Sequence, residues 1–194
     1  ILSNKLRGVE VYKAQAEISD NLIQDNQELG IYLIDNPSDA TIIIKQNNIL
    51  KNISSGIAVK NSKAEIIDNL IQENQGNGIN LVDNTIDANI IIKQNKILKN
   101  VLPGIAVRNS KAEIIGNIIQ ENQQNGIYLI DNPGGATIII KQNKILKNIS
   151  SGIALKNSKA EISDNVIQEN QSDGIFLQEN ASAIIKSNQI LSNK

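Results

Sequence analysis

A glycine followed by isoleucine or valine recurs through this sequence at two strictly alternating spacings. Successive glycines stand 22 or 26 residues apart without exception, at Gly8, Gly30, Gly56, Gly78, Gly104, Gly126, Gly152 and Gly174. The repeating unit is therefore 48 residues long and holds two related copies, of which the longer has four additional residues at one turn, residues 36–40. A period of this size is typical of solenoids, in which each repeat buries its apolar face only against its neighbours.

Each copy predicts three short strands. The first begins at the glycine and points two alternate residues inward, such as Ile31 and Leu33, and the second does the same with Ile90 and Ile92. The third places one isoleucine two residues after a fixed asparagine, in a column without exception: Ile23, Ile49, Ile71, Ile97, Ile119, Ile145, Ile167 and Ile190. This period of two indicates strands. Strands so short need to pair with their copies in neighbouring repeats.

Two columns of asparagine accompany the strands. One contains Asn21, Asn47, Asn69, Asn95, Asn117, Asn143, Asn165 and Asn188, and the other contains Asn4, Asn26, Asn52, Asn74, Asn100, Asn122, Asn148, Asn170 and Asn193. Asparagine favours tight corners because it tolerates the left-handed backbone region and bonds to nearby backbone groups. Stacked amides also bond to one another. Both columns are therefore interpreted as ladders that form the corners of the solenoid.

Composition narrows the possible functions. The 194 residues fit one domain, residues 1–194, and its core is rich in isoleucine, while aromatic residues make up 2%. With neither His, Cys nor Met, ordinary zinc or copper sites and any nucleophile–histidine pair are excluded, so no metal or cofactor is expected. A net charge of -1 provides no broad basic field for nucleic acid. No apolar run approaches the ~20 residues of a membrane span.

The pattern Gly-Ile-x-Leu … Ile-x-x-Asn-x-Ile-x-x-Asn resembles the parallel β-helix repeat of the pectin-lyase-like superfamily, in the style of its NosD-type members, over essentially the whole chain. The resemblance implies an all-β, right-handed parallel β-helix of about eight rungs, alternating between 22 and 26 residues, with three short strands per rung. It also implies an extracellular or cell-surface location. It specifies no activity, because this repeat occurs in lyases, hydrolases, epimerases, adhesins and inert stalks.

Two features are expected on the outside of the rod. A charge four residues after each asparagine of the first column alternates in sign, at Asp25, Lys51, Glu73, Lys99, Glu121, Lys147 and Glu169. Opposite charges on adjacent rungs would help to fix the register. The four aromatic residues, Tyr12, Tyr32, Tyr128 and Phe176, fall on the outward face of the first strands. In the resembling family this sheet commonly lines a polysaccharide groove, so these rings are candidates for stacking on sugars; the alternative is simple β propensity.

The best catalytic candidates are Arg108 with Asp83 and Asp131, which lie one rung below and above it. An arginine beside carboxylates is what a lyase of the resembling family would need. However, Lys60 and Lys156 occupy the positions equivalent to Arg108, and Asp35 repeats the aspartate. Such repetition favours a solvated face over an active site, and a lone Asp–Asn pair at each turn supplies too few oxygens for Ca²⁺. The outward acids of the first strands do not form a glycosidase pair either.

Short turns and nearly identical repeats favour a non-catalytic structural or interaction solenoid, such as a rigid extracellular spacer or filament module. The alternatives are a polysaccharide-binding module and, less favoured, a carbohydrate-active enzyme of the lyase or epimerase type. The chain begins and ends with the same five residues, Ile-Leu-Ser-Asn-Lys, in the same register. It is therefore expected to be a segment of a longer chain, with flanking domains, or a fibre subunit that associates end to end.

Overall fold

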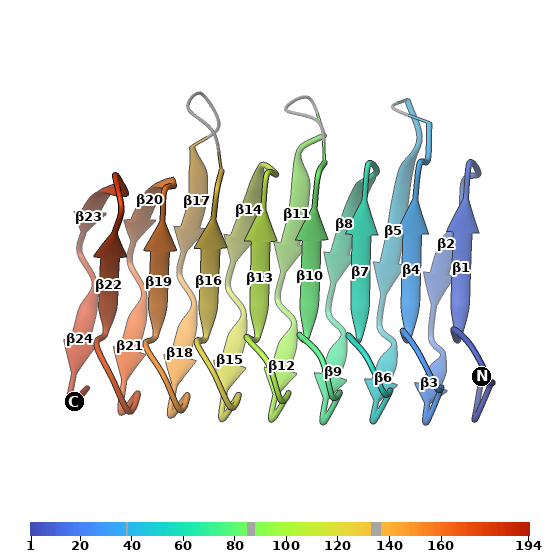
Figure 1. Ribbon diagram of the computed structural model, residues 1–194, viewed down its shortest axis with the longest axis horizontal. Helices are drawn as coiled ribbons and strands as arrows, with labels where there is room; N and C mark the ends of the chain where they lie inside the picture. The colour runs from blue at the N-terminus through green and yellow to red at the C-terminus, as the bar shows by residue number, and fades with distance from the viewer. Residues whose placement is uncertain (38, 85–87, 133–136) are drawn as a thin grey trace.

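The computed structural model describes residues 1–37, 39–84, 88–132 and 137–194, and these form one parallel β-helix (Figure 1). Every strand pairs in parallel with its equivalent one rung away, which gives three sheets of eight strands each. The predicted all-β, right-handed parallel β-helix with eight rungs and three strands per rung is confirmed. No helix in the described ranges is long and apolar enough to cross a membrane.

The three sheets run the length of the rod. The first sheet contains β1 (Val9–Tyr12), β4 (Ile31–Ile34), β7 (Ile57–Lys60), β10 (Ile79–Val82), β13 (Ile105–Arg108), β16 (Ile127–Ile130), β19 (Ile153–Lys156) and β22 (Ile175–Gln178). The second contains β2 (Glu17–Ser19), β5 (Thr41–Lys45), β8 (Lys63–Ile67), β11 (Ile90–Lys93), β14 (Ala112–Ile115), β17 (Ile138–Lys141), β20 (Lys159–Ser163) and β23 (Ser182–Lys186). The third contains β3 (Leu22–Gln24), β6 (Asn48–Leu50), β9 (Leu70–Gln72), β12 (Lys96–Leu98), β15 (Ile118–Gln120), β18 (Lys144–Leu146), β21 (Val166–Gln168) and β24 (Gln189–Leu191).

The core is a stack of aliphatic side chains from all three sheets. The predicted inward residues Ile31, Leu33, Ile90 and Ile92 are fully buried, and so is the third-strand isoleucine of the seven rungs from Ile23 to Ile167. Ile190 is 46% exposed because β24 is the last strand of the third sheet and nothing covers it in this structure. β-Branched side chains suit this stacking because they pack closely on a pleated surface.

Both predicted asparagine columns form continuous hydrogen-bonded ladders inside the corners. The Oδ1 atom of Asn74, for example, accepts bonds from the backbone N–H and the Nδ2 of Asn52, at 3.0 and 2.9 Å. The left-handed residue, however, lies one position earlier than the asparagine: φ is +59° at Gln94 and +55° at Lys99. The asparagines thus satisfy buried backbone groups, while the residues before them make the sharp bends.

A third ladder lies at the corner between the first and second sheets. Its residues belong to neither of the two asparagine columns, which therefore did not predict it. It alternates asparagine with serine, and all of its members are buried: Asn36, Ser62, Asn84, Ser110, Asn132 and Ser158. The Oγ atom of Ser62 accepts bonds from the N–H and the Nδ2 of Asn36, at 3.2 and 3.0 Å. The six rungs from Asn36 to Ser158 therefore have a polar, internally bonded residue at every corner.

The glycine that opens each first strand is required by space and not by backbone conformation. The regular column has no positive φ. A Cβ atom at Gly104 would lie 2.6 Å from Cγ2 of Ile119 and 2.8 Å from the carbonyl oxygen of Gly126. Among the glycines that the structure describes, the exception in conformation is Gly116, which belongs to a left-handed corner column and has φ +65°.

The alternating charge column forms three of its six expected pairs between adjacent rungs. The Nζ atoms of the lysines lie near the carboxylates of the glutamates one rung on, at 3.9 Å for Lys51–Glu73, 3.8 Å for Lys99–Glu121 and 3.6 Å for Lys147–Glu169. All of these side chains are largely exposed, so each pair stabilises the fold by at most ~1 kcal/mol.

Candidate functional site

The outward residues of the first sheet form two straight columns along the rod, because the strands pair in register. Column one contains Glu10, Tyr32, Ala58, Asn80, Ala106, Tyr128, Ala154 and Phe176. Column two contains Tyr12, Ile34, Lys60, Val82, Arg108, Ile130, Lys156 and Gln178. This face is the candidate functional site, since it gathers the aromatic and catalytic candidates of the sequence.

The four aromatic candidates all lie on this sheet, as the sequence indicated, but not as one cluster. Tyr32, Tyr128 and Phe176 share column one, and Tyr12 lies in column two on the first strand. Tyr128 and Phe176 are two strands apart, about 10 Å, whereas Tyr32 lies four strands from Tyr128, about 19 Å. Phe176 is 41% exposed and Tyr12 53%, while Tyr32 and Tyr128 are half-buried.

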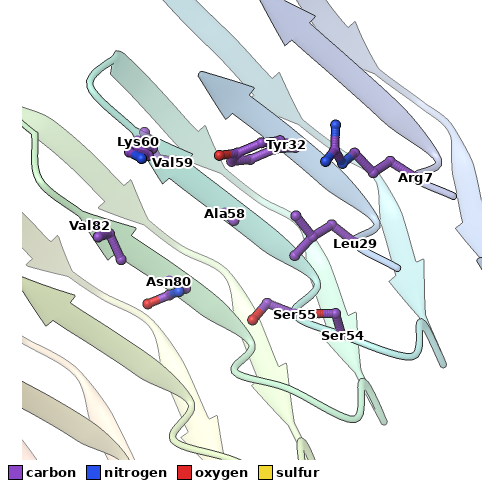
Figure 2. Close-up of a pocket in the computed structure, with 10 residues that line it drawn as sticks. All are labelled: Arg7, Leu29, Tyr32, Ser54, Ser55, Ala58, Val59, Lys60, Asn80 and Val82. Atoms are coloured by element: carbon purple, nitrogen blue, oxygen red, sulfur yellow. The ribbon is translucent and has the colours of Figure 1, made fainter. Parts of the chain in front are cut away.

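Small alanine side chains leave hollows between the larger residues of column one. In Figure 2, Ala58 lies between Tyr32 and Asn80, and Ser54 and Ser55 border the same hollow at the turn that leads into β7. Its volume is about 330 Å³. The hollow therefore offers an aromatic ring on one side, an amide on the other and hydroxyl groups at one end.

The same hollow recurs 96 residues later, which is two 48-residue units along the rod. Ala154 forms its floor between Tyr128 and Phe176, and Ser150 and Ser151 border it as their equivalents do in the first. The volume is about 300 Å³. Here aromatic rings stand on both sides, because phenylalanine replaces the asparagine of the first hollow.

Arg7 contributes to the first hollow, although the sequence had not indicated it. Its guanidinium lies over the Tyr32 ring, 4.9 Å from the centroid. Nη1 and Nε of Arg7 lie 2.6 Å and 3.2 Å from the carboxylates of Glu10 and Glu28. The hydrogen bond that Arg7 donates to Glu10, with the charges of both glutamates, raises the pKa of Arg7. The only sequence signal was its position just before the first repeat glycine, Gly8, which places it at the edge of the first sheet.

Column two carries a basic residue on every second strand: Lys60, Arg108 and Lys156. Successive members are therefore about 10 Å apart. Nζ of Lys156 lies 3.1 Å from the carboxylate of Glu179, whose hydrogen bond raises the pKa of Lys156. Positive charge thus follows the aromatic column at regular intervals.

The catalytic candidates are placed as predicted, and the arrangement is repeated. Arg108 ends β13, while Asp83 and Asp131 follow the strands on either side, β10 and β16. Nη2 of Arg108 lies 3.9 Å from Oδ2 of Asp83. Each aspartate accepts a bond from the asparagine one rung on, at 3.2 Å from Asn109 to Asp83 and 3.2 Å from Asn157 to Asp131.

The third aspartate of this kind, Asp35, accepts the same bond from Asn61 at 3.0 Å. Three equivalent turns thus hold their aspartates alike, and the arrangement around Arg108 is one instance of a repeat. Within the described residues, no group of three or more acidic, histidine or cysteine side chains is arranged to hold a metal ion.

Comparisons with known proteins agree with the architecture. No curated protein matches the chain in sequence. The solved structure of the periplasmic alginate epimerase AlgG is similar over 97% of this chain and 47% of its own, with a TM-score of 0.72 and 17% identity. The A-module of the Azotobacter vinelandii mannuronan C-5 epimerase AlgE6 is similar over 94% of this chain and 59% of its own, with a TM-score of 0.66 and 15% identity.

At these identities the likeness concerns the fold, and the chain spans about half the length of these structures. The sequence family described as the right-handed β-helix region matches residues 1–114 and 103–194, and the two matches together span the chain. This chain belongs to the right-handed β-helix family.

Proposed function

We propose that this chain is a non-catalytic solenoid that binds an extended polysaccharide along the outward face of its first sheet. The observation that supports this most is the repeated hollow, with Ala58 beside Tyr32 and Ala154 between Tyr128 and Phe176. Both hollows lie on one straight column, about 19 Å apart, on a rigid sheet. A linear polymer with regular units is the kind of ligand that such a repeated face fits.

The chemistry of the hollows suits sugars. A pyranose ring has an apolar face that packs on an aromatic ring, and hydroxyl groups that bond to serine, asparagine and lysine side chains. Binding sites commonly combine apolar walls with a few polar groups in this way. One structural neighbour is named as an alginate epimerase and the other as a mannuronan C-5 epimerase, and alginate and mannuronan are polysaccharides.

The repetition also favours binding over catalysis. A catalytic centre needs a unique set of acid, base and stabilising groups at one place. Here the candidate groups around Arg108 recur at the equivalent rungs with Lys60 and Lys156. We therefore assign the arginine and the neighbouring aspartates to the surface of the binding face, in an extracytoplasmic rod that serves as a rigid spacer. The location rests on the resemblance, and one structural neighbour is named as periplasmic.

Substitution of the rings tests the proposal. The variant Tyr32→Ala, Tyr128→Ala and Phe176→Ala is expected to lose about tenfold or more in affinity for the retained polysaccharide, because each stacking contact contributes roughly 0.5–1.5 kcal/mol. Affinity electrophoresis in polysaccharide-containing gels measures this directly. Ile91→Ala, an outward and half-buried residue of the second sheet, is the matched control. Retention that is equal in the triple variant and the wild type would overturn the assignment of this face.

A further inference from the structure

The outward face of the third sheet carries an apolar zigzag along the whole rod. Each strand of this sheet has two outward residues, its first and its third, and these form two outward columns along the rod. On each strand one outward residue is apolar and the other is polar, and the apolar residue changes from one column to the other at each successive rung. The members, in rung order, are Leu22, Leu50, Leu70, Leu98, Ile118, Leu146, Val166 and Leu191. The six inner members are half-buried, and the two end members are exposed. The other outward residue of each of these strands is polar. The apolar residues of the zigzag therefore have no apolar neighbour on the outward side of their own strand.

Charge on this face changes sign from one rung to the next. The rungs of β3, β9, β15 and β21 end in the acidic residues Asp25, Glu73, Glu121 and Glu169. The rungs of β6, β12 and β18 end in Lys51, Lys99 and Lys147. Lys96 and Lys144 add to the basic rungs, and Asp68 and Asp164 to the acidic ones. The face is therefore banded, with acidic and basic bands about 4.8 Å apart.

We propose that this face binds the same face of a second copy, with the two rods side by side and antiparallel. A two-fold axis along the strands reverses the order of the rungs and keeps the columns aligned. It can therefore set every basic rung against an acidic one, for example Lys99 against Glu121 of the second copy and the reverse. A two-fold axis along the rods would instead place each rung beside the same rung of the second copy, so that rungs of like sign would meet, which is unfavourable.

The apolar zigzags also complement each other in this arrangement. Where one copy has its apolar residue at the first position of a third-sheet strand, the opposite strand of the second copy has its apolar residue at the third position. Leu70 of one copy thus packs between apolar side chains of the other, and the stems of Lys96 and Lys144 cover the remaining apolar surface.

The size of the face agrees with a weak, specific dimer. Eight strands at about 4.8 Å and five residues at about 3.3 Å give a face of about 38 by 16 Å, or about 1,200 Å² over both copies. This is the lower end of specific interfaces, so a dissociation constant of about micromolar or weaker is expected. The described corners that flank the third sheet are short, for example residues 20–21 between β2 and β3 and residues 25–30 between β3 and β4. The third-sheet face is therefore free to meet a flat partner.

Light scattering and small-angle X-ray scattering from about 10 μM to about 1 mM test the proposal. The mass is expected to rise to that of two copies and stop, since a two-fold contact is closed. The longest dimension is expected to stay that of one rod. Association end to end, which the sequence suggested, would instead lengthen the particles without limit. One copy at every concentration, or particles that lengthen, would overturn the side-by-side dimer.

Matched variants assign the contact to this face. Leu70→Ser, Leu98→Ser and Leu146→Ser together are expected to weaken dimerisation at least tenfold. The control is Ile67→Ser, Ile91→Ser and Ile115→Ser, which changes outward half-buried residues of the second sheet. Equal effects of the two triple variants, at equal melting temperatures, would overturn the assignment.

Charge exchange tests whether the charged columns of the two copies meet in the contact. One variant carries Lys51→Glu, Lys99→Glu and Lys147→Glu, and the other carries Glu73→Lys, Glu121→Lys and Glu169→Lys. Each alone is expected to be monomeric, whereas an equal mixture is expected to dimerise. A mixture that stays monomeric although both variants melt as folded proteins would contradict the proposal; if either fails to fold, the serine variants decide. The contact does not involve the first sheet, so its failure leaves the proposed polysaccharide face untouched.

Discussion

The side-chain oxygen of Asn95 accepts two hydrogen bonds from Asn69, one from the backbone N–H at 2.9 Å and one from Nδ2 at 3.0 Å. Nδ2 of Asn95 in turn donates to the carbonyl oxygens of Ile66 and Lys93, at 2.8 and 3.0 Å. Asn95 is fully buried, so these bonds replace those that water would otherwise supply. One amide thus joins two neighbouring rungs and satisfies a bend in the backbone.

Asn95→Ala is expected to lower the free energy of unfolding by roughly 2–4 kcal/mol, because it leaves buried donors and acceptors without partners. Asn48→Ala is the control, since Asn48 is an exposed residue of β6, two strands from β12 in the third sheet, and its change is expected to cost at most about 0.5 kcal/mol. Urea denaturation measures both. Equal, small effects would show that the ladders contribute little to stability.

Gly104→Ala is expected to destabilise the fold by roughly 1–3 kcal/mol, because the new Cβ would meet the fixed side chain of Ile119 and the backbone of Gly126. Gly116→Asn tests a glycine that is favoured by its left-handed backbone conformation and not by lack of space. A Cβ atom there has its nearest neighbour at 3.8 Å, and asparagine tolerates this backbone region, so stability is expected to stay within about 1 kcal/mol. Thermal melts that rank the two substitutions in the reverse order would refute this explanation of the glycine column.

The pKa of Glu17 is lowered, chiefly by its hydrogen bond with Lys45, whose Nζ lies 2.7 Å from the carboxylate. A lowered pKa in the folded state makes the ionised carboxylate the stabilising form. Its contribution is therefore present above the unfolded pKa and is lost as the pH falls through the folded one. Lys45→Met is expected to raise the pKa of Glu17 towards its ordinary value, as NMR titration of the carboxyl carbon would show. Lys93→Met, which changes the equivalent lysine two rungs beyond Lys45, should leave the pKa of Glu17 at its wild-type value.

Filling the hollows is expected to weaken polysaccharide binding without unfolding the protein. Ala58→Leu and Ala154→Leu each place a larger side chain in one hollow between residues of column one. Either change alone is expected to reduce affinity for long chains at least tenfold, because one polymer that spans both hollows loses the avidity of the second contact. Short oligosaccharides that fill one hollow are expected to lose at most about half of their binding in either single variant, since the unchanged hollow still binds them. Calorimetry with long and short oligosaccharides distinguishes the cases, and long chains that lose no more affinity than short ones in the single variants would argue against a ligand that spans both hollows.

Much of the fold could be predicted because the repeat is nearly exact. The glycine spacing and the isoleucine column give the rung lengths, and the period of two gives the inward residues, such as Ile31 and Leu33. The offset of the left-handed bends from the asparagines could not be read in this way. In the column of Asp25, Lys51 and Glu73, the backbone is in the left-handed region, which lysine and glutamate rarely adopt. The closure of the corner imposes this conformation, and nothing in the residue types indicates it.

The candidate site was predictable in part, for a related reason. Spacing alone placed Tyr32, Tyr128 and Phe176 on one face, because the rungs stack in register. The hollows depend on which small residues, Ala58 and Ala154, stand between large ones on neighbouring strands, and this requires the strand pairing. Arg7 precedes the first repeat glycine and follows no column pattern. In the longer turn at residues 36–40, Ser38 lies outside the described residues.

The most direct test of the proposed function is a panel of neutral and anionic polysaccharides, scored for both binding and change of the polymer, with and without Ca²⁺. The account predicts that at least one linear polysaccharide is retained by the chain while its length and its sugar composition stay the same. Cleavage or epimerisation of a retained polymer would contradict the non-catalytic proposal and make Arg108, Asp83 and Asp131 the first residues to substitute. Failure to bind any member of the panel would contradict the polysaccharide face itself.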